Sequence, residues 1–120
     1  MSGNRTAIFE QLYAALSGIE GITGVFDSRA PADQAGPYIV IGHNQELEGR
    51  LIDDSERKMY VTLHIWSSYG GRAETVQLFE RVELAMPPDY CFDDAQIMKD
   101  DESGWQHGIL TYRVYFERGL

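Results

Sequence analysis

The chain has 120 residues, of which 43% are hydrophobic and 24% are charged, a composition typical of one soluble folded domain and not of a disordered chain. Ten Lys and Arg residues against 19 Asp and Glu residues give a formal net charge of −9, which disfavours tight binding to nucleic acid or to an anionic membrane. No apolar run approaches the ~18 residues needed to cross a bilayer. One cysteine excludes an internal disulfide and a cysteine-rich zinc site. We therefore expect a single domain over residues 1–120, in a reducing compartment and with no membrane partner.

The first twenty residues predict an amphipathic helix. Apolar side chains recur there at intervals of three and four residues and so share one face; they are Ile8, Leu12, Ala15, Leu16 and Ile19, with Phe9 and Tyr13 widening the stripe. Asn4 or Thr6 is placed to cap the start of the helix, and Gly18 and Gly21 are placed to end it. We interpret the segment as a structural helix.

Three segments in the first half of the chain predict β-strands. Residues 24–27 form a short candidate, and residues 36–42 form a run of aromatic and β-branched side chains bounded by glycines, which is typical of a buried strand. In residues 60–66 apolar and more polar side chains alternate, so that each set lies on its own face of the strand; the apolar set is Val61, Leu63 and Ile65.

The stretch that joins the last two of these strands, residues 43–57, is almost entirely polar. Only Leu47, Leu51 and Ile52 interrupt it. Connections of this length are uncommon inside a compact domain and are often functional. We therefore expect a projecting arm over residues 43–57, with its two ends extending the pairing of the flanking strands.

The segment after residue 66 predicts a turn and a second helix. The turn covers residues 67–71, and the helix covers residues 72–86 and is ended by Pro87 and Pro88. The expected apolar stripe of this helix is Ala73, Val76, Phe79, Val82 and Met86.

The last thirty residues predict strands. Residues 90–92 and 95–98 are short candidates, with two aspartates between them and an acidic turn over residues 99–104 after them. The clearest pattern of the chain is a strict alternation over residues 109–117, with one apolar face formed by Leu110, Tyr112, Val114 and Phe116. Strands that follow one another through short connections favour an antiparallel or mixed β-sheet with both helices packed against one face. The predicted fold class is α+β with a long β-arm.

No group of residues predicts an active site. The histidines, His43, His64 and His107, are too far apart in sequence to form a local metal-ligand pair, and we interpret His64 as a surface or inter-subunit histidine. Cys91 lies between two aromatic residues in a candidate strand, which favours a buried and inert thiol. The two acidic clusters do not match the ligand spacing of a calcium loop. We therefore expect no catalytic residue, no metal and no cofactor.

Several segments, taken in their order, resemble a known family. They are Gly-Pro-Tyr-Ile-Val-Ile-Gly at residues 36–42, Thr-Leu-His-Ile-Trp-Ser at residues 62–67, and Tyr69-Gly70-Gly71 before a helix with an early Glu74. This layout resembles the small tail-completion or tail-terminator proteins of long-tailed, siphovirus-type phages and gene transfer agents. An opening helix rich in Leu and Ala and a closing strand with alternating aromatics complete the likeness, which covers nearly the whole chain.

The resemblance implies a structural protein and not an enzyme. It implies a homo-oligomeric ring, usually a hexamer, that binds the last ring of the major tail tube protein and ends polymerisation of the tube. The ring would present a surface to the head–tail connector or stopper protein and let DNA pass without binding it tightly. The protein would then belong to the virion, at the head-proximal end of the tail, after assembly in the cytoplasm of the bacterial host.

A closed ring requires contact between two different surfaces of each subunit. We expect such surfaces in the arm and near strand ends, where backbone edges and aromatic side chains are available; the candidate interface residues are Glu46, Leu47, Glu48, Arg50, Leu51, Trp66, Tyr69 and Trp105. Acidic residues lining the bore would repel DNA from its wall; the candidates are Asp53, Asp54, Glu56, Asp100, Asp101 and Glu102.

Two other functions fit the same sequence. A head-completion protein or neck adaptor has the same size and fold class, and co-purification with heads or with tails separates it from a tail terminator. A small α+β module that binds a ligand or peptide would instead need a concave apolar pocket with convergent polar groups.

Overall fold

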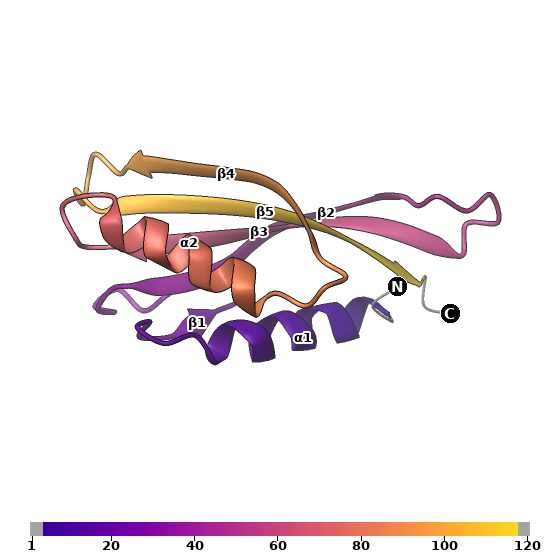
Figure 1. Ribbon diagram of the computed structural model, residues 1–120, viewed down its shortest axis with the longest axis horizontal. Coiled ribbons are helices and arrows are strands. Elements are labelled where there is room, and N and C mark those ends of the chain that lie inside the picture. Colours follow the sequence, from indigo (N-terminus) through magenta and orange to yellow (C-terminus); the bar gives the residue numbers. More distant parts are fainter. Residues whose placement is uncertain (1–3, 118–120) are drawn as a thin grey trace.

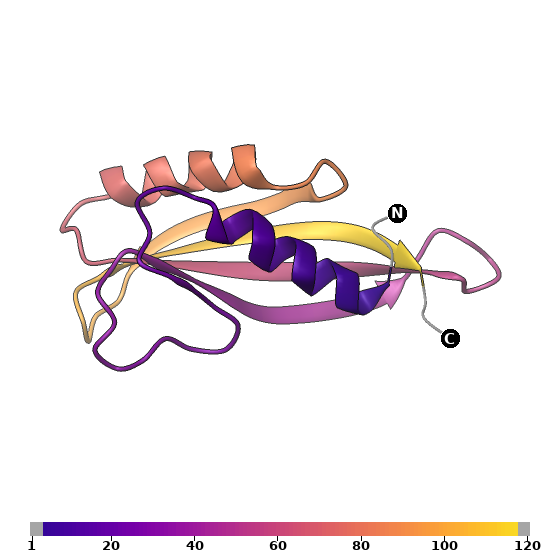
Figure 2. The same ribbon diagram turned by 90° about the horizontal axis from the view of Figure 1, so that it is seen from below.

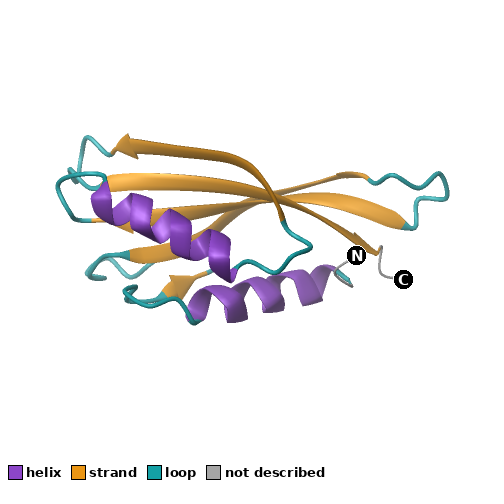
Figure 3. Ribbon diagram, viewed as in Figure 1, coloured by secondary structure: helices purple, strands orange, loops and turns teal. Residues whose placement is uncertain are grey.

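The computed structural model describes residues 4–117, which form two helices and five strands (Figure 1, Figure 3). In chain order they are α1 (Arg5–Ser17), β1 (Val25–Phe26), β2 (Tyr38–Glu48), β3 (Glu56–Ser67), α2 (Ala73–Ala85), β4 (Cys91–Lys99) and β5 (Gln106–Glu117). The strands form one sheet in the order β1-β2-β3-β5-β4. β1 is parallel to β2 and all other neighbours are antiparallel, which confirms the predicted α+β fold with a mixed sheet.

Both helices cover the same face of the sheet, as predicted (Figure 2). The hydrophobic core lies between this face and the helices, and each fully buried aliphatic side chain stabilises the fold by about 1.5–3 kcal/mol. The central strands supply alternate residues to it, which are Met59, Val61, Leu63 and Ile65 from β3 and Leu110, Tyr112, Val114 and Phe116 from β5. We call the opposite face of the sheet, which neither helix covers, the open face.

The prediction for α1 is largely confirmed. Asn4 caps the helix by accepting a hydrogen bond at Oδ1 from the backbone N–H of Ala7 at 3.0 Å, and Gly18 is the C-terminal cap. The buried stripe contains Ile8, Leu12, Leu16 and Ile19. Tyr13, expected at the margin of the stripe, is 52% exposed. Neither helix in residues 4–117 has the length and apolar character of a membrane span.

The buried face of α2 differs from the prediction. Thr75, Leu78 and Val82 are buried, whereas Val76, which was expected in the stripe, is 41% exposed. The cause lies in β5, where a Cβ atom on Gly108 would stand 2.7 Å from Cγ2 of Thr75 and 2.6 Å from a ring carbon of Phe79. Because Gly108 has no side chain, α2 packs directly on the strand through the face that contains Thr75, and Val76 turns away from it.

The two short strands expected near residue 95 are one strand, β4, with an irregularity between Phe92 and Asp94. β4 forms one edge of the sheet, and all its residues are exposed except the half-buried Ile97. The prediction of a buried thiol at Cys91 is therefore wrong, because an edge strand leaves this side chain exposed. Tyr90, just before the strand, is buried and donates its hydroxyl hydrogen to the carbonyl of Ile8 at 3.0 Å.

The arm is a β-hairpin. β2 and β3 stay paired as far as Glu48 opposite Arg57, so that only residues 49–55 form its loop. This confirms that the ends of the polar segment extend the strand pairing. The molecule measures 49 × 25 × 22 Å, and the arm extends beyond the helices at one end of the long axis while the turn between β4 and β5 lies at the other end (Figure 1).

Candidate functional site

The base of the arm is tied to α1 by a bidentate ion pair. Arg5 donates from Nη2 to Oε1 of Glu46 at 2.6 Å and from Nε to Oε2 at 2.7 Å. These hydrogen bonds lower the pKa of the Glu46 carboxyl. The Arg5 guanidinium also lies 5.5 Å from the ring centroid of Phe116 in β5. One candidate interface residue, Glu46, is therefore engaged within the chain and links the arm to α1.

The loop of the arm is closed by Arg50 and Glu56. Glu56 is only 2% exposed and accepts three hydrogen bonds from Arg50: from Nη2 at 2.8 Å, from Nε at 3.1 Å and from the backbone N–H at 2.9 Å. These bonds lower the pKa of Glu56 to about 2. The Arg50 guanidinium also lies 3.9 Å from the ring centroid of Tyr115, which is a cation–π contact. Glu56 is thus not an exposed carboxylate, and the guanidinium of Arg50 offsets its charge.

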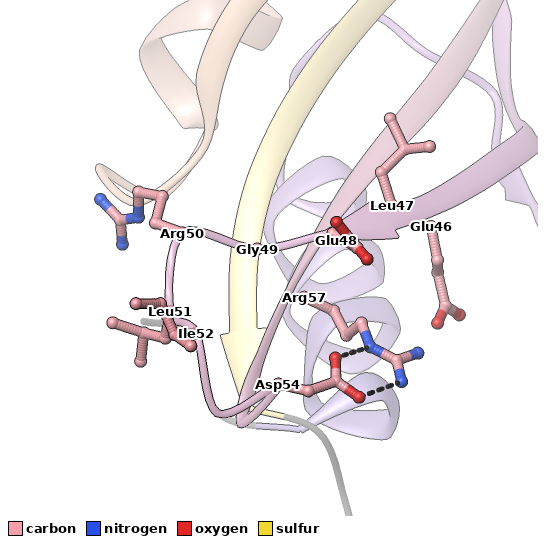
Figure 4. Close-up of a pocket in the computed structure, with 9 residues that line it drawn as sticks. All are labelled: Glu46, Leu47, Glu48, Gly49, Arg50, Leu51, Ile52, Asp54 and Arg57. Carbon is pink, nitrogen blue, oxygen red and sulfur yellow. Dashed lines mark hydrogen bonds and ion pairs between the residues drawn. The ribbon is translucent and has the colours of Figure 1, made fainter.

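The other two acidic residues of the loop also have partners within the arm. Asp54 has a φ of 59° and accepts hydrogen bonds from Nε and Nη2 of Arg57 at 3.1 and 3.2 Å (Figure 4). Asp53 accepts from the backbone N–H and the hydroxyl of Ser55 at 3.1 and 2.7 Å. Polar contacts therefore hold the loop in a defined shape.

Apolar side chains are exposed around the tip of this arm. Leu47 is 40% exposed, Leu51 48% and Ile52 fully exposed. They lie around a surface hollow of about 500 Å³ (Figure 4), whose lining residues are Glu46, Leu47, Glu48, Gly49, Arg50, Leu51, Ile52, Asp54 and Arg57. Ile52 was not among the predicted interface residues, although the sequence places this isoleucine inside a polar loop, where an apolar side chain has little to pack against.

The two tryptophans proposed for an interface come together at the opposite end of the molecule. Trp66 and Trp105 line a hollow of about 380 Å³, with Tyr38 and Asp100. Trp66 stacks on His107 at 3.9 Å between ring centroids and 10° between planes, and Trp105 lies 5.9 Å from the ring of Tyr38. Tyr69 is 55% exposed in the turn after β3. The structure therefore groups Trp66 with Trp105, and separates both from the arm.

Two of the three histidines are neighbours on the open face. Nδ1 of His64 lies 2.7 Å from Nε2 of His107, because the pairing of β3 with β5 brings together residues 43 positions apart. Burial lowers the pKa of both imidazoles. Sequence spacing alone gave no sign of this pair. Within residues 4–117, no three His, Cys, Asp or Glu side chains are close enough together to hold a metal ion.

Ser67 and Glu74, which belong to the segments that resemble the tail-completion family, form a hydrogen bond at the start of α2. The hydroxyl of Ser67, which is fully buried, donates to Oε1 of Glu74 at 2.6 Å and accepts from the backbone N–H of Tyr69 at 3.2 Å. Glu74 lies in the first turn of α2, where the helix dipole favours a negative charge. These residues fix the turn between β3 and α2 and so have a structural role.

The six acidic candidates do not form one surface. Those of the arm lie at one end of the long axis, and Asp100, Asp101 and Glu102 lie in the turn between β4 and β5 at the other end (Figure 1). Asp100 accepts hydrogen bonds from the backbone N–H and the hydroxyl of Ser103 at 2.9 and 2.7 Å. Asp101 and Glu102 are exposed.

The fold occurs in a known particle. A chain of the solved structure "Virion of native gene transfer agent (GTA) particle" superimposes with a TM-score of 0.76 and 16% sequence identity, over 88% of this chain and 91% of that one. At this identity the match shows a shared fold. No curated protein sequence matches the chain. Residues 10–117, however, match the family model "Tail completion protein gp17". The chain therefore belongs to the tail completion protein gp17 family, a family of structural tail components and not of enzymes.

Proposed function

We propose that this tail completion protein is a tail terminator. Copies of the chain form a ring, with six subunits, on the head-proximal end of the tail tube, where the ring stops polymerisation of the major tail tube protein. The free face of the ring binds the head–tail connector or stopper protein, and DNA passes through the bore.

The projecting arm with its exposed apolar tip is the observation that carries this proposal. Leu51 and Ile52 are exposed side by side in the loop of the arm, and Leu47 is exposed farther along it on the border of the same hollow. Exposed apolar clusters mark sites of protein contact. The ion pairs of Arg5 and Arg50 hold the arm in one shape. The arm therefore loses little conformational entropy when it binds a partner. Because the tip lies beyond the helices of its own subunit, it is well placed to reach a neighbouring copy or the tube.

The charge of the chain supports passage of DNA through the ring. Six copies at −9 each carry −54 formal charges, and a wall of net negative charge repels a polyanion at short range. The repulsion comes from the summed charge of the ring and does not depend on one row of carboxylates, since the acidic candidates lie at both ends of the subunit.

Polymerisation of purified major tail tube protein, with and without this chain, tests the proposal. We expect tubes to become shorter as more of the chain is added, and the chain to be found at tube ends. Replacing the tip residues, Leu51→Ser and Ile52→Ser together, should remove this effect from a folded protein. Leu84→Ser is the matched control, because Leu84 is an 88% exposed leucine on α2, away from the arm.

Two outcomes would contradict the proposal. Tubes that grow to the same length at every concentration of the chain would show that it does not terminate them. A chain that binds purified heads and not tubes would instead be a head-completion protein or neck adaptor.

A further inference from the structure

The open face of the sheet carries a group of cationic and aromatic side chains next to the arm. The pairing of β3 with β5 places Lys58 opposite Tyr115 and Tyr60 opposite Arg113. Nζ of Lys58 lies 5.4 Å from the ring centroid of Tyr60, and the guanidinium of Arg50 covers Tyr115. We call this group the basic patch; its members are Arg50, Lys58, Tyr60, Arg113 and Tyr115.

Two cations of the basic patch lack an anionic partner in the part of the chain that the structure describes. Arg50 is paired with Glu56, whereas Lys58 and Arg113 take part in none of the ion pairs within residues 4–117. The side chains of both are half-buried, and a partly desolvated charge interacts more strongly with an opposite charge than a fully hydrated one does. In a chain with 19 acidic and ten basic residues, such a patch is suited to an acidic protein surface.

The exposed acidic turn of the same subunit is too far away to neutralise the basic patch. Asp101 and Glu102 follow β4 at the end of the sheet where β5 begins, and neither forms an ion pair within residues 4–117. Gln106 and Tyr115 lie nine residue steps apart along β5, which is about 30 Å at ~3.3 Å per step. The Debye length at physiological ionic strength is only about 8 Å. The basic patch can therefore interact with the acidic turn only when the two belong to different copies of the chain.

We propose that the basic patch of one copy binds the acidic turn of the next, through Lys58 and Arg113 on one side and Asp101 and Glu102 on the other. The inference rests on the proposed ring and names the surfaces that close it. Two different surfaces at opposite ends of a subunit make a head-to-tail contact, which closes into a ring when the rotation between subunits allows it. Charge complementarity also fixes the direction of assembly, since two basic patches or two acidic turns repel each other.

Charge reversal of each surface, alone and together, tests this contact in the full-length chain. The patch variant is Lys58→Glu with Arg113→Glu, the turn variant is Asp101→Lys with Glu102→Lys, and the swapped variant carries all four changes. Association is measured by sedimentation velocity, for each protein alone and with tubes of the major tail tube protein. The control for the patch variant is Arg29→Glu with Arg72→Glu, which changes the net charge equally at two exposed arginines away from the patch. Circular dichroism confirms that each variant is folded.

We expect the patch variant and the turn variant each to associate more weakly than the wild type by more than about tenfold, because like charges then face each other. The swapped variant should associate like the wild type, and an equimolar mixture of the two single-surface variants should also recover. The control should associate like the wild type. Recovery of the swapped variant separates a direct contact from a general effect of charge.

Three results would overturn the inference. If the patch variant associates as well as the wild type, the basic patch is not in the subunit contact. If the swapped variant fails to recover, the two surfaces do not face each other. If the wild type binds a DNA duplex, and the patch variant still forms oligomers but no longer binds that duplex, the patch is a nucleic-acid site. The proposed ring itself is tested by the wild type. If the wild-type chain stays a monomer in solution and does not associate into oligomers when tubes are present, the ring proposal is contradicted.

Discussion

The guanidinium of Arg50 covers the carboxylate of Glu56 so completely that Glu56 is 2% exposed, although both residues belong to a polar hairpin that projects from the domain. A loop of this composition is expected to be solvated and mobile. Three hydrogen bonds to one carboxylate and a stacked tyrosine instead give it a fixed shape. The arm therefore has a defined shape in the isolated chain.

The Arg50–Glu56 pair predicts a specific dependence of stability on pH. The pKa of Glu56 is about 2 in the folded chain, against an ordinary value of 4.5. A carboxyl with a lowered pKa stabilises the folded state above its unfolded pKa, and this contribution is lost as the pH falls through the folded value. We expect the thermal midpoint of the wild type to fall between about pH 4.5 and pH 2, and that of Glu56→Gln to fall less over this range. Glu48→Gln, an exposed carboxylate in the same arm, is the control. Parallel curves for wild type and Glu56→Gln would contradict the prediction.

Removal of the arm should separate folding from assembly. Deleting residues 47–54 leaves Glu46 opposite Met59, joined by the four residues 55–58, a loop length common in hairpins. The core between helices and sheet is untouched, so we expect cooperative thermal unfolding of a monomer that no longer assembles on tail tubes. Normal assembly of this variant on tubes would show that the arm is not needed.

Thr75 offers a test of the packing beneath α2. Its Oγ1 is buried with no hydrogen-bond partner in the described chain, and an unsatisfied buried hydroxyl costs about 1–3 kcal/mol. Valine has the same shape without the hydroxyl, so Thr75→Val should raise the free energy of unfolding by about 1 kcal/mol. Urea denaturation measures this change, with Thr6→Val on the exposed side of α1 as the control. A less stable Thr75→Val protein would mean that the hydroxyl has a partner.

Gly108 should tolerate no side chain. A Cβ atom there would lie within 2.6–2.7 Å of Phe79 and Thr75, and overpacking of this kind costs about 1–3 kcal/mol. We expect Gly108→Ala to lower the free energy of unfolding by that amount. Gly70→Ala, where nothing lies within 4 Å of the added atom, should have little effect. Equal stability of the two alanine variants would contradict the close packing of α2 on β5.

Local patterns predicted the elements well and the contacts between them poorly. The alternation of Leu110, Tyr112, Val114 and Phe116 identified a buried strand face, because a period of two follows directly from strand geometry. The stripe of α2 was placed on Val76 because residue type was the guide, whereas the position of Gly108 in another element decides which face packs. Cys91 was expected to be buried because its neighbours in sequence are aromatic. Its side chain is exposed because β4 is an edge strand, and the sequence around Cys91 does not show which strands form the edges of the sheet.

In the candidate site, too, the sequence predicted the local segment but not the contacts between distant residues. The length and polar character of residues 43–57 correctly predicted the arm, because a connection this long and polar is uncommon inside a compact domain. The pairs Arg5–Glu46 and His64–His107 depend on strand register and on how α1 packs, because their members are 41 and 43 positions apart in sequence. Glu56 was expected to be exposed because no pattern in the sequence shows that Arg50 covers it.

Electron cryomicroscopy of tail tubes incubated with this chain would show whether copies of the chain cap the tube. We expect a ring built from copies of the chain at one end of each tube, with the arm of every copy in contact with a neighbouring copy or with the tube. Tubes whose ends carry no ring, or that bind the chain evenly along their length, would contradict it.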